Sequence, residues 1–508
     1  MYRILSASKD TYITNKIINN RFRATDANVG QAGTLDLFKL YNESISASNP
    51  TSKPIELSRL LLKFDLSSIT LLQNQGRMDV ADNSFNATLK LHDVYGGQTT
   101  PNNFNVVVFP LTKDFDEGHG FDIVNFSDLG ETNWITASYT NGAVVGWTQT
   151  GARASGSLSN ANSIDVIVSG TVTGQSSEIS LCSEQKFITG EEDLFVDVTN
   201  FVSASVKGLI PNNGFLVALS GSHEKDDKSY FVKRFASRNS ANTSIRPKLI
   251  IKFDDSLIDN HSDFTYDHTG SLYLSNMVRN QLTNIVSGAA ATEVQGENCM
   301  LLKIQTGSIF SQVMTASQAL VGSSRRTGVY SSSFAISSFD DLYDHIQTSG
   351  SIVFDEIWSS FDETVTYLSA SLTVKKSDTS ALDFNQTKYN VVTLNLADRY
   401  KVNEEARIRV FVETNSRPVA FVKSPIEKKS EIFTNMHYRV RDFISGEIII
   451  PFDKNDNSTK LSADSNGMYY DFSMSNLPKG RTFIFDYLIV VNGFDNVIMD
   501  AAAKFVVE

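Results

Sequence analysis

The chain has 508 residues, of which 41% are hydrophobic and 20% are charged, with a formal net charge of −12. This composition is typical of a globular protein with a buried core, and at about 150 residues per domain it predicts roughly three domains. Acidic residues outnumber basic ones, and Lys and Arg form no cluster in the sequence. This argues against a nucleic-acid-binding protein, because phosphate contacts need concentrated positive charge. We therefore expect no nucleic-acid partner.

Targeting signals and covalent crosslinks are sparse. The first five residues, MYRIL, do not form the basic segment and apolar core of a secretory signal. No stretch approaches the roughly 20 apolar residues that span a bilayer. The chain has only two cysteines, Cys182 and Cys299, so a zinc site of four thiolates is excluded. The two cysteines are either buried free thiols or joined in one disulfide. We expect a soluble protein with no signal peptide and no membrane partner.

Alternation of apolar and polar residues with a period of two recurs along the chain. This is the pattern of strands that bury one face. The clearest examples, in chain order, lie at residues 59–66, 88–92, 248–253, 406–413 and 483–490. Turn-rich segments that contain Gly, Pro and Asn separate them. The pattern predicts an all-β protein with several β-sandwich domains.

Helical signals are few. Ser338 and Asp341 resemble a capping box, and the apolar residues that follow them predict one short helix that ends before Gly350. The segment 272–285 fits either a strand pair or an amphipathic helix, and periodicity alone does not decide between them.

Two changes of composition suggest domain boundaries. A polar, acidic run follows the strand that ends at Phe253, and a weaker break lies within residues 377–386. These breaks predict domains at residues 1–254, 255–380 and 381–508.

Short motifs follow one another in the N-terminal half. They are DTYI at 10–13, NVG at 28–30, LDL at 35–37, RLLLKFDLS at 59–67, DEG at 116–118, TNW at 132–134, GWT at 146–148, VDVT at 196–199, NGF at 213–215, FASRNS at 235–240 and RPKL at 246–249. In this order they resemble the DNRLRE family, a group of β-sandwich modules found beside carbohydrate-active domains and in surface proteins. The resemblance implies a jelly-roll β-sandwich over about half of the chain, and a fold far more than a site.

The motif residues that we expect to define this fold are Asp10, Tyr12, Asn28, Gly30, Arg59, Lys63, Phe64, Asp65, Asp197, Arg238, Arg246 and Pro247. Asp65 follows a strand directly and can bond local amides there. We expect the three arginines to pair with Asp65, Asp197 or Glu117 at the rim of the sandwich.

Three segments are long for a compact module of this type, namely residues 42–57, 73–85 and 152–177. Long loops on a rigid sandwich are where contacts are made. The C-terminal half carries no motif of comparable specificity. Residues 469–493 read as a hairpin that closes an immunoglobulin-like sandwich, and this region resembles the strand-rich domains of structural proteins of tailed phages.

Catalytic patterns are absent from the sequence. It has seven histidines and no HExxH motif, nucleophile elbow or phosphate-binding loop. The densest polar group comprises Asp114, Asp116, Glu117 and His119, which fits either a metal or acid/base site or a solvated loop. We expect no enzyme and no cofactor.

Two groups of residues fit binding sites, and each also fits a purely structural role. Asp453, Asn455, Asn457 and Asp464 have the spacing of oxygen ligands in a calcium loop, but Ser458 stands where that loop needs glycine, so a β-turn is the alternative.

Trp134, Trp147 and Tyr139 could form a platform on which a sugar stacks, or the aromatic side chains could belong to the core.

Together these features favour a non-enzymatic virion protein of a tailed phage, located in the tail, baseplate, neck or surface decoration. Such a protein folds in the host cytoplasm and leaves by assembly and lysis, which agrees with an acidic, cysteine-poor chain without an export signal. Its expected partners are other virion proteins, including symmetric copies of itself. The alternative is a carbohydrate-binding or adhesion module for a cell-surface polysaccharide. Exposure of Trp134 and Trp147 distinguishes the two.

Overall fold

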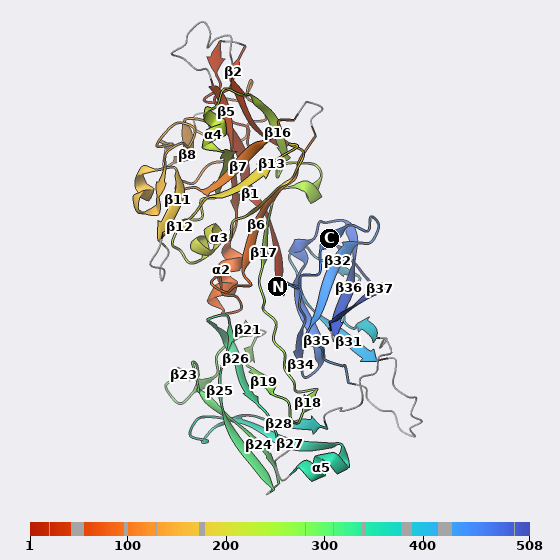
Figure 1. Ribbon diagram of the computed structural model, residues 1–508. Helices are drawn as coiled ribbons and strands as arrows, with labels where there is room; N and C mark the ends of the chain where they lie inside the picture. The colour runs from red at the N-terminus through yellow and green to blue at the C-terminus, as the bar shows by residue number, and fades with distance from the viewer. Residues whose placement is uncertain are drawn as a thin grey trace. The chain divides into compact units, whose positions relative to one another are not determined.

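The computed structural model describes residues 1–19, 21–41, 55–95, 100–127, 130–171, 178–279, 281–307, 309–337, 342–376, 389–414, 429–491 and 493–508. Strands form nearly all of the regular structure, which confirms the predicted all-β, multi-domain fold (Figure 1). The chain divides into two compact units. The N-terminal unit comprises Arg3–Leu71 and Asn86–Ile251, and the C-terminal unit comprises Met1–Tyr2, Leu72–Phe85 and Lys252–Glu508.

The N-terminal half consists mainly of strands, with a few short helices between them. The strands are β1 (Tyr2–Thr14), β2 (Ile17–Ile18), β3 (Phe22–Arg23), β4 (Thr34–Tyr41), β5 (Ile55–Phe64), β6 (Asn86–Leu91), β7 (Phe104–Pro110), β8 (Thr136–Thr140), β9 (Ala143–Gly146), β10 (Ser155–Ser157), β11 (Val166–Thr171), β12 (Glu178–Ser180), β13 (Ser183–Phe187), β14 (Leu194–Asp197), β15 (Phe215–Leu219), β16 (Tyr230–Ala236) and β17 (Lys248–Lys252). The helices are α2 (Ser67–Asn74), η1 (Leu158–Ser163), α3 (Thr199–Val206), α4 (Gly221–Lys225) and η2 (Thr243–Ile245).

The main sheet of the N-terminal unit has ten strands. Eight of them run in the order β13, β7, β15, β5, β1, β17, β6 and β14, and β4 joins β5 to β16. Strand β1 pairs antiparallel with β5, which places Thr11 opposite Leu61. The sheet thus brings the two ends of the N-terminal half together, since β1 also lies beside β17.

Strand β5 is buried on both faces, and this corrects the expectation of one buried and one exposed face. Leu60, Leu61 and Leu62 are all inaccessible to solvent, and Arg59 is 7% exposed. A second core made from the connecting segments covers Leu61, and it includes Trp134 and other apolar residues. A strand in the middle of a sheet can be covered on both faces when its connections are long enough to fold over it.

The C-terminal half is also built from strands. They are β18 (Phe264–Thr265), β19 (Gly270–Ser275), β20 (Met277–Val278), β21 (Gln281–Leu282), β22 (Val286–Ser287), β23 (Thr292–Glu293), β24 (Met300–Thr306), β25 (Phe310–Val321), β26 (Ser324–Phe334), β27 (Ser351–Ser359), β28 (Thr366–Lys375), β29 (Tyr389–Thr393), β30 (Arg399–Tyr400), β31 (Glu405–Thr414), β32 (Met436–Asp442), β33 (Ile448–Ile450), β34 (Ser462–Asp464), β35 (Gly467–Ser473), β36 (Arg481–Val491) and β37 (Phe494–Val507). The helices are α5 (Tyr343–Ser349) and η3 (Met474–Asn476).

Three sheets carry most of the C-terminal unit. A seven-stranded sheet has the order β18, β28, β27, β24, β25, β26 and β19, and buries Tyr330 and Trp358 completely. A four-stranded sheet (β29, β31, β35, β34) and a five-stranded sheet (β30, β37, β36, β32, β33) form the final sandwich. Aromatic rings fill this sandwich, where Tyr438 stacks on Tyr470 with centroids 4.3 Å apart.

The segment 73–85, expected as a loop of the N-terminal sandwich, belongs to the C-terminal unit instead. Within this segment, the backbone carbonyl of Gln75 accepts a hydrogen bond of 3.1 Å from the N–H of Thr327 in β26. Gly76 has φ +64°, and a Cβ there would lie 1.8 Å from the carbonyl oxygen of Arg325. This φ is unfavourable for residues with a side chain, and the close approach to the carbonyl leaves no room for a Cβ, so glycine is required here.

The helix before Gly350 is confirmed as α5, and Gly350 ends it with φ +77°. The expected cap at Ser338 and Asp341 lies outside the described residues. The ambiguous segment 272–285 forms strands. Both cysteines are free thiols. Within the described residues, no helix is long and apolar enough to cross a membrane.

Candidate functional site

Several motif residues meet in one polar cluster inside the N-terminal unit. Asp10 on β1 is buried, and its Oδ2 accepts a hydrogen bond of 2.6 Å from the N–H of Arg238. Glu117 bridges the two, because its Oε1 accepts bonds of 2.9 Å from the N–H of Asp10 and 2.5 Å from Nε of Arg238. The predicted pairing of an arginine with Glu117 is thus confirmed for Arg238.

The turn at residues 28–30 closes this cluster. The side chain of Asn28 donates to the carbonyls of Glu117 at 3.0 Å and Thr132 at 2.9 Å, and accepts from the N–H of Gly120 at 2.8 Å. A Cβ at Gly30 would lie 1.9 Å from the carbonyl oxygen of Glu117. Asn28 and Gly30 therefore hold the loop that carries Glu117.

Burial determines the protonation of Asp10. Its Oδ1 has no hydrogen-bond partner among the described residues. Burial raises the pKa of this carboxyl to about 7, with a smaller contribution from Glu117, while the N–H and charge of Arg238 and the charge of Arg246 act in the opposite direction. These hydrogen bonds join β1, the loop that carries Glu117 and the segment before β17.

The other two arginines do not form the predicted rim pairs. Arg59 instead makes a buried ion pair with Glu224 of α4, with Nε to Oε1 at 2.9 Å and Nη2 to Oε2 at 2.5 Å. Its Nη1 donates to the carbonyls of Gly151 and Ala152. Arg246 donates to the carbonyl of Ser240. Glu224 belongs to no motif, so this pair could not be expected from the order of motifs.

The remaining motif residues make local contacts. Asp65 and Asp197 each accept a hydrogen bond from an N–H two residues further on. Lys63 pairs with Asp114 at 2.9 Å. Tyr12 and Phe64 are core residues, and burial raises the pKa of Tyr12.

Pro247 is buried next to β17.

The expected sugar platform is not formed by the two tryptophans. Trp134 is 4% exposed and Trp147 is 7% exposed. Nε1 of Trp147 donates to the carbonyl of Asn133 at 3.0 Å. Tyr139 is 50% exposed, but its hydroxyl bonds the carbonyl of Gly142 in the turn between β8 and β9. The core alternative therefore describes both tryptophans.

The polar group of Asp114, Asp116, Glu117 and His119 does not form one site, because its members contact different partners. Asp114 and Asp116 lie near Lys9, and Glu117 bonds Arg238. Nδ1 of His119 lies 3.7 Å from Glu131, and its side chain is 91% exposed.

Three of the four residues with the spacing of a calcium loop, Asp453, Asn455 and Asn457, lie in a turn. Oδ1 of Asp453 accepts from the N–H of Asn455 at 3.3 Å, and its Oδ2 accepts from the hydroxyl of Ser458 at 2.6 Å. Asp464 lies on β34, where both its oxygens bond Arg409 at 2.9 Å. Asn457 adopts φ +53° in this turn. Among the described residues, no group of three His, Cys, Asp or Glu side chains could hold a metal ion.

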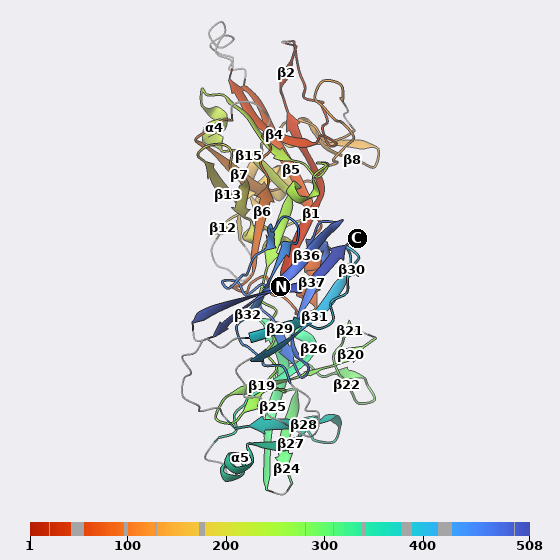
Figure 2. The ribbon, with the colours of Figure 1, turned by 90° about the vertical axis from the view of Figure 1, so that its right-hand side faces the viewer.

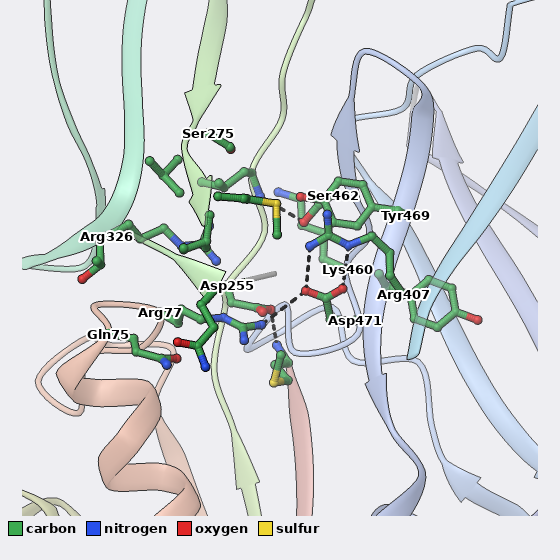
Figure 3. Close-up of a pocket in the computed structure, with 18 of the residues that line it drawn as sticks. Gln75, Arg77, Asp255, Ser275, Arg326, Arg407, Lys460, Ser462, Tyr469 and Asp471 are labelled. Carbon is green, nitrogen blue, oxygen red and sulfur yellow. Dashed lines mark hydrogen bonds and ion pairs between the residues drawn. The ribbon is translucent and has the colours of Figure 1, made fainter. Parts of the chain in front are cut away.

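The C-terminal unit contains a cavity of about 300 Å³ that no motif predicted (Figure 3). It is lined by Met1, Gln75, Arg77, Asp255, Leu257, Ser275, Met277, Gln281, Leu282, Arg326, Thr327, Val329, Arg407, Tyr438, Ser458, Lys460, Ser462, Tyr469, Tyr470 and Asp471. These side chains come from Met1, the segment 72–85, residues 255–282, strand β26 and residues 407–471 of the C-terminal unit. The site is therefore assembled from residues that are far apart in the sequence.

Charged side chains meet in this cavity. Arg407 binds Asp471 through two hydrogen bonds, of 2.8 Å from Nε and 3.0 Å from Nη2, and Arg77 approaches the same carboxylate at 3.3 Å. The guanidinium of Arg407 also lies 4.2 Å from the ring centroid of Tyr469. Figure 3 shows Arg77, Arg326 and Arg407 extending toward one another from different segments. Spacing along the chain could not reveal this site.

The end of the β36–β37 hairpin presents an apolar edge. Phe494, Val497 and Met499 are 74%, 49% and 63% exposed. Strand β37 pairs with β36 over residues 494–499 and again over 504–507, but on its other side β30 reaches only Val506 and Val507. Among the described residues, no strand is therefore hydrogen-bonded to the outer side of residues 494–499, although β29 packs near β37. Figure 2 shows the end of this hairpin, in deep blue, extending from the sandwich.

Neither a protein-family model nor a curated protein matches the chain. Among solved structures, fibronectin(III)-like modules of Clostridium thermocellum CbhA are similar, with 10% identity over 50% of this chain and 90% of that chain and a TM-score of 0.14. A variant of Salmonella alpha-2-macroglobulin has 9% identity over 58% of this chain, with a TM-score of 0.15. Trypsin-activated alpha-2-macroglobulin from Escherichia coli has 8% identity over 94%, with a TM-score of 0.14.

This chain spans 18% and 29% of these two macroglobulin chains. TM-scores this low carry no argument about function.

Proposed function

We propose that the chain is a non-enzymatic structural protein that acts by protein–protein assembly, and that it belongs to the virion of a tailed phage. The observation that supports assembly most directly is the edge at residues 494–499, where unpaired backbone and exposed apolar side chains coincide. A strand edge of this kind is a template for pairing with another chain, and soluble proteins usually protect such edges with charge, proline or a covering segment.

The side chains at this edge match an assembly role. Phe494 and Met499 are large and mostly exposed, so their burial by a partner would remove substantial apolar surface from water. Lys454 and Asp495 form an exposed ion pair at 2.8 Å beside this edge. An apolar centre beside charged residues is the usual arrangement of a protein interface. We propose that the partner is a virion protein or a second copy of this chain.

The virion assignment rests on the sequence, through the resemblance of the C-terminal half to phage structural domains. The carbohydrate-binding alternative would need a surface other than the predicted platform, because Trp134 and Trp147 are core residues.

The proposal is tested by fractionating a lysate of the source on a density gradient and following the chain with an antibody. We expect it to sediment with intact particles, and gold labelling then gives its position. Recovery only in the soluble fraction or the cell wall would contradict the virion role, and a glycan-binding screen would follow.

The edge is tested by the double variant Phe494→Ser/Met499→Ser. We expect its incorporation into particles to fall at least tenfold, because the interface loses its apolar anchors. The matched control is Phe361→Ser, which removes an aromatic side chain that is 62% exposed elsewhere in the same unit. Equal incorporation of both variants would show that the edge is not the contact.

A further inference from the structure

The cavity of the C-terminal unit concentrates positive charge in an otherwise acidic protein. The chain as a whole carries a formal charge of −12. The charged side chains that line the cavity are Arg77, Arg326, Arg407 and Lys460 against Asp255 and Asp471. Two positive charges are thus unbalanced among the side chains. A water-filled recess with low-dielectric walls focuses this field and attracts anions.

Both carboxylates are already engaged by other groups. Asp471 binds Arg407 and Arg77, as described above. Asp255 lies 2.8 Å from the amino group of Met1. The acidic residues of the cavity are therefore bound to cations other than Arg326 and Lys460.

Arg326 provides the second observation. Its side chain comes from β26 and is almost wholly buried, with the residue 7% exposed. Its Nε has no hydrogen-bond partner, and its guanidinium makes no ion pair with any residue in the described part of the chain. Burial lowers its pKa, and the charge of Asp255 acts in the opposite direction. A buried cation without a bonded partner is costly, unless a ligand supplies the partner.

We propose that this cavity binds a small organic molecule that carries two negative charges on phosphate or carboxylate groups. The fork of the Arg326 guanidinium suits the planar or tetrahedral oxygens of such groups. The two cations of the lining that bind no carboxylate among the described residues, Arg326 and Lys460, match a dianion. The volume of about 300 Å³ lies at the lower end for small-molecule sites. The ring of Tyr469, held beneath Arg407, offers an apolar wall to the rest of the molecule.

The test measures binding to the full chain by calorimetry and by thermal unfolding. The probes are inorganic phosphate and succinate at pH 7.5, and sodium chloride at the same ionic strength is the reference. We expect a saturable response to at least one probe, with a Kd below about 1 mM. A response to phosphate alone indicates a phosphorylated ligand, and a response to succinate alone indicates a dicarboxylate.

The decisive variant is Arg326→Met, which keeps much of the apolar volume and removes the charge. We expect it to weaken binding at least tenfold. Without the probe it should unfold at the same temperature as the wild type or higher, because an unpaired buried charge is gone. The matched control is Arg325→Met, since the neighbouring arginine is paired with Glu297 at 3.2 Å outside the cavity. We expect that control to bind like the wild type.

A second variant, Lys460→Gln, keeps the proposal falsifiable if Arg326→Met does not fold. Lys460 lines the cavity, and no ion pair of its side chain occurs with the described residues. We expect its substitution to weaken binding at least threefold. Two results would overturn the proposal: no saturable response up to about 20 mM of either probe, or binding by the folded Arg326 or Lys460 variants that is as tight as in the wild type.

Discussion

The N–H of Arg238 donates a hydrogen bond of 2.6 Å to the carboxylate of Asp10, although 228 residues separate them in the sequence. This contact joins the segment before β17 to β1 and closes the N-terminal unit. It also buries a carboxyl group whose Oδ1 lacks a partner among the described residues. Formation of the N-terminal unit therefore buries the carboxyl group of Asp10 and changes its protonation.

Asp10 should make the N-terminal unit less stable as pH rises from about 4 to about 7. The folded pKa is raised to about 7, whereas an unfolded Asp titrates near about 3.9, so the folded state binds more protons between these values. The free energy of unfolding should fall by up to about 4 kcal/mol over this window and stay constant above it. Denaturant unfolding between pH 4 and 8 measures this slope.

The variant Asp10→Asn should remove most of this pH dependence, because its amide oxygen can still accept from Arg238 and does not titrate. Asp65→Asn is the control, since Asp65 is exposed and accepts only a local hydrogen bond. A slope in Asp10→Asn equal to that of the wild type would contradict the assignment.

His261 should make the C-terminal unit less stable in alkaline solution. Its Nδ1 bonds Asp259 at 2.8 Å, and its Nε2 bonds the buried Glu356 at 2.6 Å. Burial opposes the charged form, but these two carboxylates outweigh burial and raise the pKa of His261 to about 10. The stabilisation should be complete below pH about 6.5 and disappear as pH rises through about 10.

Melting temperatures of the wild type and His261→Gln between pH 6 and 10.5 check this expectation. The wild type should lose stability with rising pH, and the variant should start lower and change less. His345→Gln, at an exposed position in α5, should follow the wild type. A flat wild-type profile would refute the role of His261.

Gly76→Ala should destabilise the segment that supplies Arg77 to the cavity. Its φ of +64° strains any side chain, and the added Cβ would meet the carbonyl of Arg325. Gly446→Ala is a matched control, because φ is +74° there and no atom lies within 4 Å. We expect a loss of more than about 3 kcal/mol of unfolding free energy for Gly76→Ala and about 1 kcal/mol for the control. Equal losses in denaturant titrations would show that the close approach has no energetic role.

The buried pair of Arg59 and Glu224 should be strongly coupled. Arg59→Met leaves the carboxylate of Glu224 buried without its partner, so we expect a loss of about 3–5 kcal/mol. The double variant Arg59→Met/Glu224→Met should lose less than the sum of the two single variants. Lys63→Met on the same strand is the control, because its pair with Asp114 is more exposed and should be worth less than about 1 kcal/mol. Additive losses in a double-mutant cycle would disprove the coupling.

The sequence predicted local conformation where neighbours in the chain determine it. Alternating apolar residues identified the strands, and Gly350 identified the end of α5. The same reasoning was wrong about β5, because its second face is covered by the distant segment that contains Trp134. It was also wrong about Arg59, whose partner Glu224 lies 165 residues away.

The residues of the candidate sites also fall into those that the sequence indicated and those that only the structure revealed. Asp10, Asn28 and Gly30 belong to motifs with a recognisable order, so the sequence indicated them as residues that make the fold. Arg326 and Lys460 belong to no motif, and their common cavity could not be anticipated. Residue type does not reveal burial, so the sequence alone does not distinguish a sugar platform from core tryptophans.

What the sequence by itself determined is the all-β class, the positions of the strands β5, β6, β17, β31 and β36, and the ordered motifs of the N-terminal half. These follow from short-range periodicity and turn chemistry, which act between residues close in the chain. Only the tertiary structure decided that segment 72–85 joins the C-terminal unit, that Asp10 is buried with a raised pKa, and that Arg326 faces a cavity without a bonded partner. Burial and charge pairing depend on residues that meet only after the chain has folded.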